Sequence, residues 1–234
     1  MTLEYIIIIW YTNMSTIKVW LENKITLHKH DNKQEELLNS LTHAIGAALS
    51  IAATIIMIFR SFQSSWSNIK GVIIFGISMI LLYSASSLYH FTKHLTLKRL
   101  LRILDHSNIY LLIAGTYTPI CFFMNNKTGW IMFLTIWIFA IAGIIFTLVF
   151  WGKHGWLHVA IYLLMGWTVV FFWKQVNNSI PLSIIKWMIA GGVTYSAGII
   201  FYSIKKLPFY HAIWHTFVVA GSACFFFGIY FYLI

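Results

Sequence analysis

The sequence predicts an all-α fold, a polytopic membrane protein built as a seven-transmembrane helix bundle with its N-terminus in the cytoplasm. Hydrophobic residues make up 59% of the 234 residues and charged residues only 9%. A water-soluble domain carries roughly a quarter charged residues, so most of this surface must face lipid. Two further observations support the bundle: seven long apolar stretches divide the chain, and most basic residues lie in the segments between them.

The apolar stretches have the length that a membrane requires. A spanning helix needs about 20 mostly apolar residues, because the hydrocarbon core is about 30 Å thick and each helical residue rises about 1.5 Å. The stretches cover 41–59, 71–91, 107–124, 130–151, 156–173, 187–204 and 211–234. Glycines within them predict close approach of helices. These glycines are Gly143, Gly166, Gly191, Gly192, Gly198 and Gly221.

The first 40 residues differ from the rest of the chain. We therefore divide it into an N-terminal segment, 1–40, and a seven-helix transmembrane domain, 41–234. The apolar run 5–11 is too short to span a membrane, and Met14 is an alternative start of translation. Residues 15–40 are polar and mixed in charge, which predicts an interfacial or loosely ordered cytoplasmic segment.

The distribution of lysine and arginine predicts the orientation, because basic residues gather in cytoplasmic loops. With the N-terminus inside, eleven basic residues lie in the cytoplasm and five lie outside. The inner set is Lys18, Lys24, Lys29, Lys33, Lys93, Lys98, Arg99, Arg102, Lys153, Lys205 and Lys206. The outer set is Arg60, Lys70, Lys127, Lys174 and Lys186. We expect a multi-pass protein of the plasma membrane with its C-terminus outside.

The formal net charge of +10 does not indicate nucleic-acid binding. The basic residues stand in short loops, without the interleaved aromatic residues that would stack on bases. Anionic lipid headgroups are the expected partners of such loops. The two cysteines, Cys121 and Cys224, lie inside apolar stretches and form no metal-binding or disulfide pattern.

Ionisable residues at the ends of three spans predict a functional site. Asp105 is the only carboxylate after residue 37, and an ionisable group beside the membrane core is costly unless it has a partner. The predicted topology places Ser86 and His90, Asp105, and the pair His211 and His215 at the cytoplasmic ends of spans two, three and seven. His211 and His215 are four residues apart and therefore share a helix face. With His90 they offer three nitrogen ligands to an ion such as zinc and leave a fourth position open to water.

Each of these residues also has an ordinary interpretation. A histidine at a span end is commonly an interfacial residue, an aspartate before a helix is commonly an N-cap, and Ser86 could bond its own helix. His154 and His158 repeat the same four-residue spacing, but the adjacent Lys153 and Gly155 indicate a loop edge. His43, with Asn39 and Thr42, could support the site or mark a polar boundary.

Several segments resemble the hemolysin III proteins, the bacterial branch of the progestin and adipoQ receptor (PAQR) family. They are YSASSLYHFTKH with Ser86 and His90, LDHSNIYLLIAGTYTPICF with Asp105, and HAIWHTFVVAGS from His211; NSLTHAIGAALS and YLLMGW are also similar. The resemblance covers residues 38–234 and implies seven helices and an intramembrane zinc ion. It implies His90, His211 and His215 as the ligands, Asp105 as the residue that holds the water, and Ser86 as a supporting residue.

The resemblance also implies functions. The related ceramidases suggest a zinc-dependent hydrolase, or a sensor, of a membrane lipid amide, with Asp105 as general base and Ser86 as a donor to the oxyanion. The hemolysin name suggests a pore-forming cytolysin, although a pore needs a polar lining along its full depth. A membrane-homeostasis receptor with a structural metal is the third hypothesis. The sequence leaves open which lipid is bound, whether turnover occurs, the metal's identity and the oligomeric state.

Overall fold

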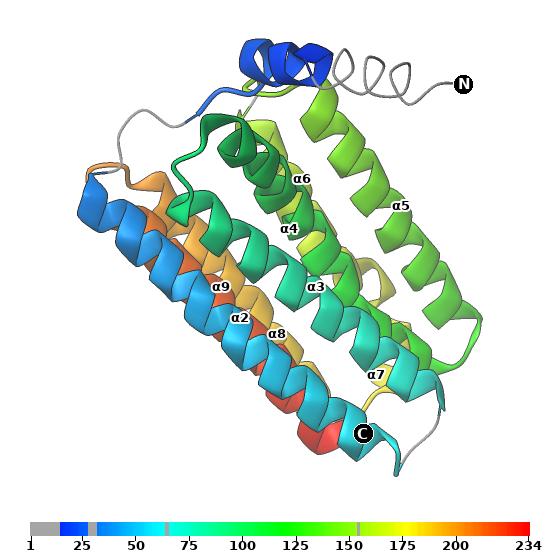
Figure 1. Cartoon of the computed structure of the whole chain (residues 1–234). Coiled ribbons are helices and arrows are strands. Elements are labelled where there is room, and N and C mark those ends of the chain that lie inside the picture. The colour runs from blue at the N-terminus through cyan, green and yellow to red at the C-terminus, as the bar shows by residue number, and fades with distance from the viewer. Residues whose placement is uncertain (1–14, 28–31, 64–65, 154) are drawn as a thin grey trace, which may run out of the picture.

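The computed structural model describes residues 15–27, 32–63, 66–153 and 155–234 (Figure 1). This part of the chain is helical and contains no strand. The proposed alternative start at Met14 and the imidazole of His154 lie outside it. The helices after residue 32 are α2 (Lys33–Ser61), α3 (Trp66–Phe91), α4 (Leu95–Met124), α5 (Lys127–Val149), α6 (Gly155–Gly166), α7 (Trp173–Ser179), α8 (Leu182–Ser203) and α9 (Tyr210–Tyr232), with a 3-10 helix, η1 (Thr168–Phe172), between α6 and α7.

These helices form seven segments that are long and apolar enough to cross a membrane, as the sequence predicts. Six are single helices, and the fifth runs over Gly155–Ser179 through α6, η1 and α7. Successive segments run antiparallel, so α2, α4 and α9 begin at the end of the bundle where α3 and α8 finish (Figure 1). We refer to this as the α2-start end.

A short helix over residues 15–24 lies across the α2-start end (Figure 1). It buries Leu21, with Ile25 just beyond it, against Trp151, while Ile17 and Trp20 remain exposed. A helix with one side on the bundle and apolar side chains on the other fits the interfacial position that the sequence predicts. The domain boundary at residue 40 stays a prediction, because α2 is continuous from Lys33.

Many large apolar side chains cover the outside of the bundle, as a protein surrounded by lipid requires. Phe59, Phe91 and Phe171 are each at least 70% exposed. The interior holds Phe75, Tyr83 and Tyr110, which are almost fully buried. Large apolar and aromatic side chains thus lie outside the bundle as well as inside it, because lipid chains solvate apolar side chains well.

Close contacts between helices occur at most of the predicted glycines. An added Cβ at Gly143 would lie 2.2 Å from the Tyr110 ring, and one at Gly221 would lie 2.5 Å from the Tyr195 ring. Gly191 and Gly198 are similarly enclosed. The prediction is wrong for Gly166, because nothing lies within 4 Å of its added Cβ, and Gly192 meets Trp167 only at an ordinary 3.7 Å.

Gly166 instead marks a break in the fifth span, which the sequence predicted as one helix over 156–173. The chain leaves the α-helix there and continues as η1. The Tyr117 hydroxyl of α4 donates to the Gly166 carbonyl at 2.6 Å and accepts from the Val169 N–H at 3.1 Å. Backbone groups freed inside a membrane must find partners within the protein, and Tyr117 supplies them.

Candidate metal centre

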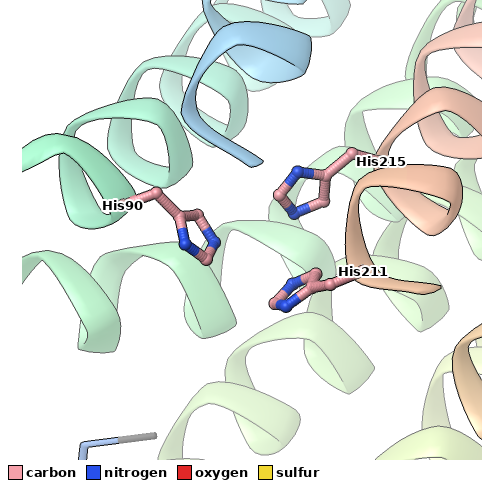
Figure 2. Close-up of side chains that lie close together, drawn as sticks. All are labelled: His90, His211 and His215. Atoms are coloured by element: carbon pink, nitrogen blue, oxygen red, sulfur yellow. The ribbon is translucent and has the colours of Figure 1, made fainter. Parts of the chain in front are cut away.

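Three histidines meet at the α2-start end of the bundle. His90 lies in the last turn of α3, and His211 and His215 lie in the first turns of α9. All three are at least 94% buried, and their rings point toward one another (Figure 2). One ring nitrogen of each lies within 4.8 Å of the others. The structure therefore brings together the three histidines that the sequence singled out.

The chemistry of the cluster fits a metal ion. The Nε2 atoms of His90 and His215 are buried and have no hydrogen-bond partner among the described residues. Such atoms are costly in a protein interior and need an explanation. Zinc bonds of about 2.0–2.1 Å to imidazole require nitrogens about 3.4 Å apart in a tetrahedral site, so ring movements of about 1 Å would close the cluster on an ion.

The opposite ring nitrogens of two histidines are held by α2. His90 Nδ1 lies 3.1 Å from Glu36 Oε2, and His215 Nδ1 lies 3.1 Å from the Asn39 carbonyl oxygen and 3.2 Å from Thr42 Oγ1. A carboxylate or carbonyl on one nitrogen of an imidazole fixes its tautomer and leaves the other nitrogen as the ligand atom. Both contacts thus direct Nε2 toward the cluster.

Asp105 and Ser86 lie beside the histidines, as the topology predicts. Both are buried. The Asp105 carboxyl interacts with Ser86, with the His90 ring and with Arg102, although the Ser86 hydroxyl has no partner at strict hydrogen-bond distance in the described structure. A carboxylate, a hydroxyl and three imidazoles therefore lie close together in the buried interior of the bundle.

His43 belongs to the surroundings of this cluster rather than to a polar boundary. Its ring stacks on that of His215, with centroids 3.6 Å apart and an interplanar angle of 17°, and it is 99% buried. The stacked His43 ring limits rotation of the His215 ring. It therefore supports the orientation of His215, the first of the two alternatives that the sequence left open.

His158 does not reach the cluster. Its Nδ1 contacts the Tyr110 hydroxyl and Thr147 Oγ1, both at 3.3 Å, on the other side of α4. Spacing alone could not separate this histidine from the α9 pair, whereas the fold separates them.

Glu36 is the site residue that sequence reasoning missed, because it was assigned to the N-terminal segment. Its carboxylate contacts His90 and accepts from Lys98 Nζ at 3.2 Å. The signal was present in the spacing: Glu36, Asn39 and His43 repeat at intervals of three and four residues and so share one face of a helix. That face of α2 is the one that contacts the cluster.

The seven-span helical bundle and its three converging buried imidazoles define the class: a multi-pass membrane protein with a buried histidine cluster near one face. Residues 31–226 match the family described as "Haemolysin-III related". The chain is 41% identical over 204 residues to "Hemolysin-3 homolog" of Bacillus subtilis (strain 168), which covers 86% of this chain and 95% of that protein. It is 42% identical over 203 residues to "Hemolysin-3" of Bacillus cereus, covering 86% and 93% of the two chains.

The similarity extends to an animal protein. "Monocyte to macrophage differentiation factor" of Homo sapiens, a PAQR protein, is 28% identical over 209 residues, covering 85% of this chain and 84% of that protein. The chain therefore belongs to the haemolysin-III related family, as its motifs predict.

Proposed function

We propose that this protein is a zinc-dependent hydrolase that cleaves an amide bond of a membrane lipid. The observation that supports this most is the pair of buried, unpartnered Nε2 atoms of His90 and His215 beside His211 and Asp105. Three imidazoles with one position left open are typical of catalytic rather than structural zinc sites. A bound zinc ion would polarise the carbonyl group and favour attack by water at neutral pH.

The remaining steps belong to side chains of this chain. The Asp105 carboxylate takes the proton of the attacking water and returns it to the leaving amine as the carbon–nitrogen bond breaks. The Ser86 hydroxyl donates to the negative charge that develops on the carbonyl oxygen. Glu36, Asn39 and His43 hold the imidazoles in place.

An apolar cavity beside the histidines suits an acyl chain. It lies between α4, α6, α8 and α9 and extends from Trp214 and Tyr162 to Tyr117. The Trp214 ring contacts the rings of His211 and His215 at centroid distances of 5.5 and 5.3 Å. A lipid chain in this cavity would bring its headgroup linkage toward the cluster. The site would face the cytoplasmic side of the plasma membrane in the orientation predicted above.

Metal analysis of purified His211→Ala, with turnover of a fluorescent N-acyl sphingosine, tests the proposal. We expect the variant to lose zinc and hydrolysis, while His94→Asn, at the same end and still able to cap α4, retains both. Full zinc occupancy in His211→Ala would refute the ligand assignment. Zinc binding by the wild type without turnover of lipid amides or esters would favour a receptor with a structural metal.

The name "Hemolysin-3" of the Bacillus cereus relative favours a second function, pore formation. Against a pore within one bundle stands the distribution of ionisable groups, since the histidine cluster lies at helix ends and Asp105 lies beside it. A conducting path needs available polar groups along its depth, whereas the buried hydroxyls of Ser50, Thr54 and Thr118 bond the carbonyls of their own helices. Ion leakage from liposomes that contain the purified protein, unchanged after zinc removal, would support the pore over the hydrolase.

A further inference from the structure

A second pocket opens at the α2-start end, on the other side of α4 from the histidine cluster. Its walls come from Thr26, from Arg102 and His106 of α4, from Trp151 after α5, and from Lys153 and His158. About 180 Å³ of space is available in it, where a single water needs about 10–15 Å³ by the same measure. The pocket therefore has room for a group of several heavy atoms.

The walls of this pocket are positive. Arg102 is 93% buried and packs its guanidinium over the Trp151 ring, 5.6 Å from the centroid. Lys153 is exposed at the mouth. α6 begins at Gly155, which also lines the pocket, and a helix N-terminus adds partial positive charge. Asp105 interacts with Arg102 from within α4, but no described acidic side chain lines the pocket.

The N-terminal segment closes the pocket on one side. Arg99 Nε donates to the Ile25 carbonyl at 3.2 Å, which fixes the backbone beside Thr26. Arg99 lies three residues before Arg102, on the same face of α4. The Arg99–Ile25 hydrogen bond thus holds the end of the helix over residues 15–24 beside the pocket. Ile17 and Trp20 of this helix are exposed and suit the membrane interface.

We propose that this pocket binds the phosphate group of an anionic phospholipid. A guanidinium offers paired N–H donors to phosphate oxygens, a helix N-terminus favours the same charge, and basic pockets between membrane helices at the headgroup level bind anionic lipids. The neighbouring exposed apolar residues on the helix over residues 15–24 supply the interfacial depth at which such a phosphate lies. This pocket lies outside the metal centre, although Arg102 also interacts with Asp105, and the proposal does not depend on hydrolysis.

Binding can be measured on the full chain in a neutral detergent, by the shift in thermal unfolding temperature as dioctanoyl phosphatidylglycerol is added. We expect the lipid to stabilise the wild type, and dioctanoylglycerol, which lacks phosphate, to leave it unchanged. Lys153→Gln and Arg102→Gln should weaken the apparent affinity by about tenfold. Lys206→Gln, an exposed lysine at the same end, is the matched control and should bind like the wild type.

Lys153→Gln keeps the test decisive even where Arg102→Gln does not fold, because Lys153 is exposed. Equal affinity of Lys153→Gln and the wild type, or equal stabilisation by dioctanoylglycerol, would overturn the proposal. A parallel titration with inorganic phosphate at constant ionic strength identifies the source of the anion. Stabilisation by inorganic phosphate without stabilisation by the phospholipid would overturn the assignment to lipid.

Discussion

The Glu36 carboxylate determines how the His90 ring is presented to the cluster. It accepts from His90 Nδ1 and leaves Nε2 directed at the other histidines. Because such carboxylate partners contribute about 10–100-fold to metal affinity, we expect Glu36→Ala to weaken zinc binding by that factor. Glu36→Gln, whose amide oxygen can still accept from Nδ1, should lose less. Competition with a zinc-binding dye measures the affinity.

Two variants separate this role from a general effect on the α2-start end. Glu35→Ala removes the neighbouring carboxylate, which makes no side-chain contact with the cluster, and should leave the affinity unchanged. Lys98→Gln removes the other partner of Glu36 and should change the affinity by less than about threefold, since an ion pair that is still partly open to solvent contributes little. Wild-type affinity in Glu36→Ala would show that the carboxylate does not position His90.

The residue pattern predicts the histidine cluster because its members mark span ends whose positions follow from topology alone. His90, His211 and His215 could be placed at one end of the bundle by counting spans. Glu36 could not, because an apolar stretch ends where hydropathy falls, whereas α2 continues about two turns further to Lys33. The continuation carries Glu36 and Asn39 to the histidines, so the apolar criterion excluded the helical turns that support them.

Two adjacent glycines of α8 differ in how closely a neighbouring helix approaches them. An added Cβ at Gly191 would lie 2.5 Å from the Phe225 ring and 3.2 Å from the Gly221 carbonyl of α9, whereas one at Gly192 would meet Trp167 at an ordinary 3.7 Å. We expect Gly191→Ala to be destabilised by about 1–3 kcal/mol through overpacking. Gly192→Ala should be unchanged or stabilised by up to about 1 kcal/mol, because alanine favours the helix.

Thermal unfolding of the two variants in the same detergent measures this difference. Equal unfolding temperatures would show that α8 and α9 have room to separate at Gly191. α9 also carries His211 and His215. An outward shift of α9 in Gly191→Ala would therefore change the contacts of His215 with Asn39 and Thr42 of α2.

The break in the fifth span could not be predicted from the sequence. The stretch 156–173 has the composition of an unbroken span, and its glycine at 166 resembles the packing glycines of other helices. The break depends on the Tyr117 hydroxyl, which reaches Gly166 and Val169 from a different helix. A contact between residues 49 positions apart leaves no local signal, so the number of spans could be predicted but not this irregularity.

The antiparallel order of the seven spans places the histidine cluster and most of the basic residues at the same end of the molecule. The ends of α3 and α9 that carry the histidine cluster lie at the α2-start end (Figure 1). By the order of the spans, most of the basic residues belong to the same end. Because lysine and arginine are retained on the cytoplasmic side, the histidine cluster and the basic pocket should both face the cytoplasm. The orientation of the chain therefore determines which leaflet supplies their ligands.

Reporter fusions in a bacterial host measure this orientation. With the N-terminus inside, alkaline phosphatase fused after Ile234 should be active and green fluorescent protein at the same place should be dark. Fusions after Lys206, in the segment between α8 and α9, should give the reverse pattern. Only one span, α9, separates Lys206 from Ile234, so the two positions lie on opposite sides of the membrane. The opposite result at both positions would invert the topology, place the cluster and the basic pocket at the outer face, and require an outer-leaflet lipid for each.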